Sequence, residues 1–182
     1  MTVELLTASG EFDRKPEQDR WETTMKFAVS QPSFFDFMKI KYGTQFVERI
    51  YLSELAEPYT MTAEKVVTAD GREHFTAWLA NQAREVPNGT LHRISPEVID
   101  QDMFETFATM GAPRLYAERV EPVQGVSIEW IEGYYTIVDI TDIGINPQAQ
   151  AFYQEYRSVL DGVVETPQAL DGEWIAHHLI AA

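Results

Sequence analysis

The chain contains no cysteine among its 182 residues. This absence excludes disulfide bonds, thiolate metal ligands and thiol nucleophiles, and it fits a reducing compartment. No positively charged start leads into an apolar run, and no stretch approaches the roughly 18 uncharged apolar residues that would span a membrane. We therefore expect a soluble protein with no membrane contact, either cytoplasmic or part of a complex assembled inside the cell.

Basic residues are scarce, with 14 Lys and Arg against 29 Asp and Glu, so the formal charge is −15. Residues 92–182 hold 15 acidic residues and only 4 basic ones, none of them lysine. Because phosphate binding depends on clustered Lys and Arg, this composition argues against direct binding to nucleic acid or to an anionic membrane. The acids are spread among apolar residues, which also argues against a mimic of the DNA backbone. Solubility or a basic protein partner explains the charge.

Motifs that identify a reaction are absent as well. The sequence has no Gly-x-x-x-x-Gly-Lys-Ser/Thr loop and no Gly-x-Gly-x-x-Gly fingerprint, and the segment around Ser127 lacks the second glycine of a nucleophile elbow. The four histidines are His74, His92, His177 and His178. Adjacent side chains point apart on a helix or a strand, so the pair near the C-terminus is a poor metal site. We expect no metal and no cofactor.

The chain is rich in apolar residues, which make up 45% of it and include 4 Trp, 8 Tyr and 10 Phe. A chain of this length and composition can bury a core in one domain. No internal repeat, low-complexity tract or linker divides it, and its expected strands and helices follow no regular βαβ order. We therefore predict a single α+β domain over 1–182, with a mainly antiparallel sheet, three to five covering helices and a partly extended N-terminal arm at 1–20.

The segment 125–143 predicts a hairpin at the centre of this sheet, with strands at about 126–131 and 134–140. β-branched and aromatic residues fill both arms, and Gly133 supplies the positive φ of a two-residue turn after Glu132. In this register Trp130 pairs with Tyr135. The apolar face then carries Val126, Ile128, Trp130, Tyr135 and Ile137.

Two interpretations of Asp139 follow from this register, which places it on the apolar face. A buried carboxyl there would have a raised pKa and would be a candidate acid. A carboxyl near the strand end would instead reach solvent or accept a hydrogen bond from a turn N–H, and we favour this second interpretation. Glu129 and Glu132 fall on opposite faces, so they are a poor pair of catalytic carboxylates.

The remaining elements are predicted from hydrophobic spacing and capping signals. Alternation from Trp21 to Val29 predicts a strand, whereas Asp70 and Glu73 have the spacing of a capping box and predict a helix that ends before Pro87. The expected helices span about 33–42, 45–57, 71–86, 96–110 and 147–161. Short strands are expected at 2–7, 91–94 and 114–120, and residues 173–181 form either a strand or a short helix.

Two groups of residues are candidates for binding a partner. One is the aromatic cluster beside Pro32, and the other is the histidine pair of the tail. An exposed aromatic cluster would dock a partner, whereas a buried one is ordinary core and is the more frequent case. The candidate partner-binding residues are Phe34, Phe35, Phe37, His177 and His178.

We therefore expect a non-enzymatic interaction or assembly subunit, such as a viral or phage structural or adaptor protein, that acts through an acidic, aromatic-containing surface. Its partner would be another protein or a second copy of the chain. Two alternatives stay open. One is a small-ligand binding domain with an aromatic-lined pocket, and the other is an acid/base enzyme that brings histidine and carboxylate residues together. No catalytic residue is assigned.

Overall fold

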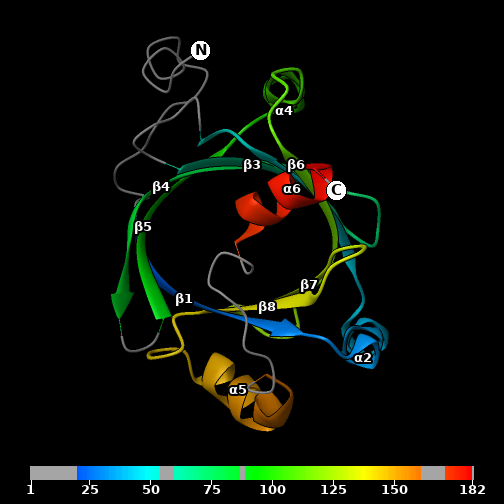
Figure 1. Ribbon diagram of the computed structural model, residues 1–182, viewed down its shortest axis with the longest axis vertical. Coiled ribbons are helices and arrows are strands. Elements are labelled where there is room, and N and C mark those ends of the chain that lie inside the picture. The colour runs from blue at the N-terminus through cyan, green and yellow to red at the C-terminus, as the bar shows by residue number, and fades with distance from the viewer. Residues whose placement is uncertain (1–19, 54–59, 87–88, 161–170, 182) are drawn as a thin grey trace.

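A computed structural model describes residues 20–53, 60–86, 89–160 and 171–181, and the strands within these ranges form a closed antiparallel barrel. The order around the barrel is β1-β5-β4-β3-β2-β6-β7-β8, and the ring closes because β1 pairs with both β5 and β8 (Figure 1). The predicted single α+β domain with a mainly antiparallel sheet is confirmed. The expected strand at 2–7 and nearly all of the expected arm at 1–20 lie outside the described residues.

The bounds of the elements show which predictions hold. The strands are β1 (Arg20–Val29), β2 (Gln45–Tyr51), β3 (Thr60–Val67), β4 (Glu73–Val86), β5 (Gly89–Val98), β6 (Arg114–Val120), β7 (Val126–Trp130) and β8 (Thr136–Thr141). The described helices are α2 (Pro32–Tyr42), α4 (Gln101–Ala108), α5 (Pro147–Leu160) and α6 (Gly172–Ala181). The predicted strands at 21–29 and 114–120 and the predicted helices at 33–42 and 147–161 are confirmed within one or two residues. The tail forms a helix rather than a strand.

The predicted helix at 45–57 is wrong, because residues 45–51 form strand β2. Val47 and Tyr51 pack inside the barrel, whereas Ile50 packs on its outer wall. Both faces of this strand are therefore partly covered, so its apolar residues show no clear alternation and happen to fall at helical spacing.

The predicted helix at 71–86 is also wrong, because Asp70 and Gly71 form the hairpin turn between β3 and β4. The Gly71 N–H donates to the Thr68 carbonyl oxygen at 2.9 Å, and the φ angle of Gly71 is +85°. The following residues pair with β3 along its whole length. Asp-Gly was therefore a hairpin signal rather than the start of a capping box.

The helix predicted at 96–110 begins later than expected. Asp100 is the N-cap of α4, and its Oδ1 accepts a hydrogen bond from the Met103 N–H at 2.7 Å. Pro96 belongs instead to β5, where it pairs with Trp78 of β4. A side-chain cap four residues downstream thus sets the start of the helix, rather than the proline.

The predicted hairpin is present as β7 and β8, but its register differs by one residue. Trp130 pairs with Thr136 rather than with Tyr135. The turn does centre on Glu132 and Gly133, and the Tyr134 N–H donates to the Ile131 carbonyl oxygen at 3.0 Å. Tyr134 and Tyr135 then stay in the loop, where their rings pack edge to face at 5.4 Å and lie against the inner core. The shift moves Asp139 from the predicted apolar face to the inside of the barrel.

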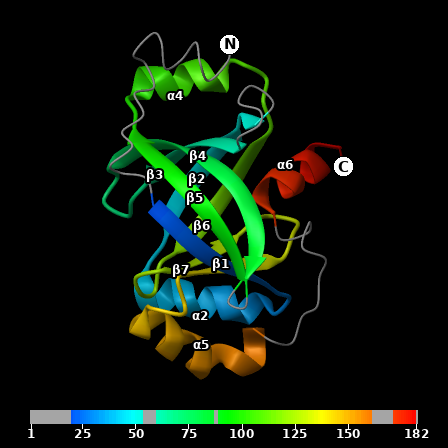
Figure 2. The same cartoon turned by 90° about the vertical axis from the view of Figure 1, so that its left-hand side faces the viewer.

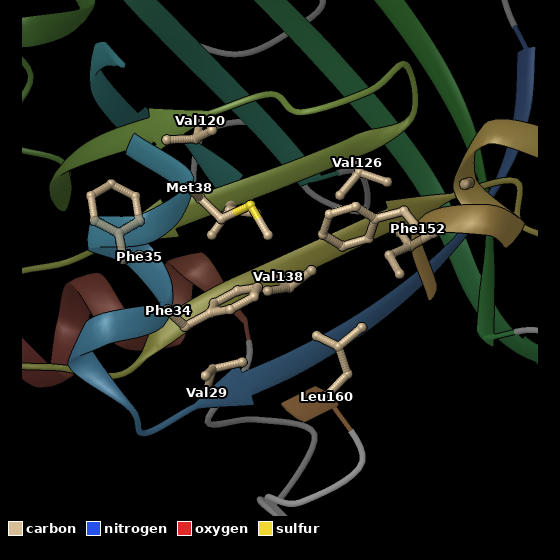
Figure 3. Packing of buried hydrophobic residues seen from close by; sticks show 12 residues of the cluster. Val29, Phe34, Phe35, Met38, Val120, Val126, Val138, Phe152 and Leu160 are labelled. Atoms are coloured by element: carbon tan, nitrogen blue, oxygen red, sulfur yellow. The ribbon is translucent and has the colours of Figure 1, made fainter. Parts of the chain in front are cut away.

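Helices cover two opposite parts of the outer wall and one mouth of the barrel (Figures 1 and 2). α4 packs over a cluster that includes Ile50, Ala63 and Phe107. α2 and α5 cover a second cluster on β1, β6, β7 and β8, shown in Figure 3, where Phe34, Met38 and Phe152 meet the strands. The helix α6 lies across the mouth and packs Ile175 and Ala176 against the inner core. The inside of the barrel is therefore a separate compartment.

Candidate functional site

Charged side chains gather inside the barrel, in the lumen. Residues paired across antiparallel strands share a face, and side chains alternate along each strand. Ala28, Val47 and Ile137 belong to the inner core, so the residues two positions away also face the lumen. We call the resulting set the lumen belt. It consists of Lys26, Gln45, Arg49, Glu64, Arg119, Glu129 and Asp139.

Arg49 of β2 joins two carboxylates of the lumen belt. Its Nε donates to Glu64 Oε2 at 2.7 Å, its Nη1 donates to Glu129 Oε1 at 2.7 Å, and its Nη2 donates to Glu129 Oε2. The contact with Glu129 is therefore bidentate, which is the strong form of an arginine–carboxylate pair. The exposed fractions of the three side chains are 14% for Arg49, 9% for Glu64 and 10% for Glu129.

Arg49 and the carboxylates that it contacts favour the ionised forms of one another. Burial by itself would raise the pKa of Glu129, but the charge and hydrogen bonds of Arg49 outweigh it and hold the pKa below its ordinary value. Burial would lower the pKa of Arg49, yet Glu129 and Glu64 keep it well above its ordinary value. Both partners are therefore ionised at neutral pH. Nearby, burial raises the pKa of Tyr51 to about 12, so its phenol stays neutral.

Arg119 of β6 extends the lumen belt toward its rim. It donates to Gln45 Oε1 from Nε at 3.3 Å and from Nη2 at 3.2 Å, and its Nη1 lies 3.4 Å from Glu64 Oε1. Its Nε also lies 3.2 Å from Glu121 Oε1, and the Glu121 side chain is 51% exposed. Both arginines of the lumen belt are thus engaged by protein acceptors.

Asp139 of β8 is the under-bonded member of the lumen belt. Its Oδ1 is buried and accepts no hydrogen bond from any residue that the structure describes. Its Oδ2 lies 4.0 Å from Lys26 Nζ, which is an ion pair but too long for a hydrogen bond. Burial raises the pKa of Asp139 above its ordinary value, with Lys26 acting against the shift and Glu129 adding to it. The Asp139 side chain is 31% exposed although its Oδ1 is buried, so it combines the raised pKa of the first interpretation with the solvent access of the second, and it lies on the inner face of the hairpin.

This raised pKa gives a prediction for Asp139→Asn. The folded state holds the Asp139 proton more tightly than the unfolded chain, so its stabilising contribution is full below the ordinary pKa of about 3.9 and is lost as the pH rises through the folded-state value. Because asparagine has no carboxyl group to ionise, the variant does not lose this contribution to stability as the pH rises. We expect the free energy of unfolding of the variant to rise relative to that of the unchanged protein as the pH increases from 4 to 7, measured by urea denaturation.

The control for this prediction is Asp36→Asn, since Asp36 is exposed on α2. It should change the free energy of unfolding by a similar small amount at every pH. A difference between Asp139→Asn and the unchanged protein that is constant from pH 4 to pH 7, or that grows in the opposite direction, would contradict the assignment.

The sequence-predicted site residues do not lie in the lumen belt. Phe34 and Phe35 are buried under α2, where Phe34 packs edge to face against Tyr156 and Phe35 stacks on Trp130. Phe37 is 52% exposed on the same helix, and His177 is exposed on α6. The side chain of His178 lies outside the described residues. The structure thus separates these residues, and their role in binding a partner stays a prediction.

Sequence reasoning missed the lumen belt because its members come from six strands, one of which was predicted as a helix. One signal was available. Arg114 and Arg119 are two of only four basic residues in the second half of the chain, and both lie in the segment predicted as a strand. A basic residue placed there needs a nearby acid, and Glu129 in the next strand was a candidate.

Two further kinds of feature are absent from the described residues. They contain no group of three or more His, Asp or Glu side chains placed to hold a metal ion. They also contain no helix long and apolar enough to cross a membrane.

Comparisons with known proteins identify the fold. No protein-family model and no curated protein matches the chain. Among solved structures, the PH1819 protein of Pyrococcus horikoshii OT3 is similar, with a TM-score of 0.54 and 14% identity over 88% of this chain and 99% of that chain. The PH1012 protein of the same organism has a TM-score of 0.52 and 17% identity over 85% and 98% of the two chains. At these identities the likeness shows that the chain shares a fold with both proteins.

Proposed function

We propose that the protein binds a small polar molecule in the lumen of its barrel. The observation that carries this proposal is the lumen belt itself. Moving an ion out of water costs several kcal/mol of desolvation free energy, and the attraction of a partner of opposite charge offsets only part of this cost. A core of the same volume made from apolar residues would be at least as stable, so the buried charges are better explained by a ligand than by folding.

The architecture around the lumen belt supports the same function. A closed barrel of eight strands is wide enough either for packed side chains or for one small ligand. Apolar side chains and α6 fill the lumen at one mouth. Away from that mouth, the lumen-facing residues Glu22, Thr24 and Ser127 are only half-buried. The charged level of the lumen therefore lies between a closed end and an accessible region.

An interaction or assembly subunit is the second candidate, because α2 displays apolar side chains on its outer face. Phe37 is 52% exposed and Ile40 is 87% exposed. Large exposed apolar side chains close together favour contact with a protein partner or a second copy of the chain. Light scattering of the unchanged protein and of the Phe37→Glu/Ile40→Glu variant tests this candidate. A monomer in both cases, with no difference in pull-down partners, would remove it.

A fragment screen by ligand-observed NMR tests binding in the lumen. The probes are small ammonium compounds, carboxylates, phosphates and neutral alcohols. Ser127 pairs with Asp139 and faces the lumen, so Ser127→Phe fills the space beside the lumen belt. Ser158→Phe makes the same change at an exposed position on α5. We expect at least one class of probe to bind the unchanged protein and the Ser158→Phe variant, and to lose binding in Ser127→Phe. Equal binding in all three proteins, or no binding of any class, would overturn the proposal.

A further inference from the structure

We propose that the outer wall of the barrel, between α4 and α2, binds an arginine-rich segment of a partner protein. The two helices cover different parts of this wall (Figure 1). The surface between them lies outside the lumen, so the inference does not depend on the proposed function. Three observations lead to it, namely a group of exposed aromatic side chains, a cleft beside them, and a free carboxylate on a strongly acidic chain.

Strand β6 crosses this surface from one helix to the other. At its start, Arg114 Nη2 donates to the carbonyl oxygen of Ala108, the last residue of α4. Further along, Glu118 Oε1 accepts a hydrogen bond from Lys39 Nζ of α2 at 3.2 Å. Side chains two residues apart on a strand share a face, so Tyr116 lies between these two contacts on the outer wall. Tyr116 is 62% exposed, so neither helix covers it.

Two more exposed rings lie beside Tyr116 on the neighbouring strands. Phe46 of β2 and Trp130 of β7 both pair with Glu118, so each is a diagonal neighbour of Tyr116 on the same face. Phe46 is 55% exposed, and Trp130 is 37% exposed while its ring stacks on Phe35 of α2. We call Phe46, Tyr116 and Trp130 the aromatic patch. Exposed aromatic side chains close together indicate a surface that binds a partner.

A cleft of about 500 Å³ lies beside the aromatic patch, at the end nearer to α4. Tyr116 and Arg114 of β6 form part of its wall, and Glu132 of the turn between β7 and β8 also lines it. Gly111 and Ala112, which connect α4 to β6, are small and leave the space open. The cleft therefore places an aromatic ring and a carboxylate beside one cavity that a side chain of a partner can enter.

The cations around the aromatic patch already have carboxylate partners. Arg114, Lys39 and Lys65 each lie within 3.6 Å of a glutamate. The pairs are Arg114 with Glu48 at 3.2 Å, Lys39 with Glu118 at 3.2 Å and Lys65 with Glu73 at 3.6 Å. These charges offset one another, so the surface has no excess of positive charge that would repel a cationic segment.

Glu132 lacks such a partner. It is exposed, and it makes no ion pair or hydrogen bond with any residue that the structure describes. The chain as a whole carries a formal charge of −15, which attracts a basic segment at long range. A guanidinium group fits this surface because its flat face stacks on an aromatic ring and its forked donors match a carboxylate. A lysine ammonium lacks the planar fork.

Fluorescence anisotropy with three labelled peptides of equal length tests the inference. The peptides alternate glycine with arginine, lysine or glutamate. We expect the arginine peptide to bind the unchanged protein at least about 3-fold more tightly than the lysine peptide, which has the same charge but no guanidinium groups. The glutamate peptide should not bind. Equal affinities of the arginine and lysine peptides, or no binding of the arginine peptide, would overturn the inference.

The variant Tyr116→Ala/Glu132→Gln locates the site. It should reduce the affinity for the arginine peptide about 10-fold, because it removes both the ring and the free carboxylate. Trp21→Ala/Asp102→Asn is the matched control, since Trp21 is also 62% exposed and Asp102 is exposed on α4. This control removes one ring and one negative charge elsewhere, so the affinity should change less than about 2-fold. Equal losses in both variants would mean that net charge alone attracts the peptide, and the inference would be wrong.

A measurement on the unchanged protein keeps the test independent of how the variants fold. The indole N–H signal of Trp130 reports on the aromatic patch, and that of Trp21 reports on a distant exposed ring. The arginine peptide should shift the Trp130 signal and leave the Trp21 signal in place. A shift of Trp21 alone, or of neither tryptophan on binding, would contradict the inference.

Ser127→Phe separates this inference from the proposed function. Ser127 faces the lumen, so the variant should bind the arginine peptide with the affinity of the unchanged protein while it loses the probes of the fragment screen. Loss of peptide binding in Ser127→Phe would place the peptide in the lumen and overturn the inference. Failure of the lumen probes, with peptide binding kept, would overturn the proposed function alone.

Discussion

Arg49→Met is expected to lower the free energy of unfolding by about 3–5 kcal/mol at pH 7, which is the usual cost of removing one partner from a buried ion pair. The methionine fills much of the same space, so the loss comes from charge rather than volume. Glu64 and Glu129 then face each other inside the barrel with little access to water and without the cation that lies between them. Denaturant unfolding followed by circular dichroism measures the change.

Arg72→Met is the matched control for this substitution. Arg72 also pairs with a carboxylate, since its Nε lies 3.0 Å from Asp70 Oδ2, but its side chain is 77% exposed. Surface ion pairs contribute little, so we expect a change of less than about 1 kcal/mol. Equal decreases in the free energy of unfolding of the two variants would show that burial does not determine the contribution of Arg49 to stability. A loss of under 1 kcal/mol in Arg49→Met would have the same meaning.

A second expected result concerns two phenylalanines on α2 that lie three residues apart. Phe34→Ala should cost about 3–5 kcal/mol, the range for removing a buried aromatic ring. Phe34 is 6% exposed and belongs to the cluster under α2 and α5 (Figure 3). Its ring also contacts that of Tyr156, with centroids 5.8 Å apart. Its loss leaves a cavity between the helices and the outer wall of the barrel. Thermal or urea unfolding gives the value.

Phe37→Ala provides the comparison on the same helix. Phe37 is 52% exposed, so its truncation should change the free energy of unfolding by less than about 1 kcal/mol. If Phe37 contacts a partner, the variant should instead reduce that association while stability stays the same. A cost for Phe37→Ala as large as that for Phe34→Ala would mean that the helix packs differently from the structure.

The elements with strong local signals were predictable from sequence. The helix over 147–160 has a proline at its first position and an apolar stripe, and the strand over 21–29 alternates cleanly, so local preference and burial agree. The elements that were predicted wrongly lie where pairing between strands of the barrel, rather than local sequence, determines the structure. Asp70-Gly71 resembles a helix start, and only the pairing of β4 with both β3 and β5 makes the following segment a strand. Such long-range pairing leaves no mark within a short window.

The candidate site was harder to predict than the fold. Arg49 and Glu129 are 80 residues apart in sequence, and they meet only because the sheet closes into a barrel. The position of Asp139 depended on a register that differed by one residue, which is enough to reverse the face of every side chain in a strand. A raised pKa for Asp139 was the interpretation not favoured from the sequence, and Glu129, which acts on Asp139, was predicted on the opposite face of the hairpin.

Chemical-shift mapping of the unchanged protein with a small-molecule probe that binds in the fragment screen tests the central claim most directly, because it locates binding residue by residue. Our account predicts that the largest shifts fall on Lys26, Ser127 and Asp139, which line the lumen on β1, β7 and β8. It also predicts that Phe37 and Ile40, on the outer face of α2, stay unchanged. Shifts confined to α2 or the outer wall, with the three lumen residues unaffected, would contradict it.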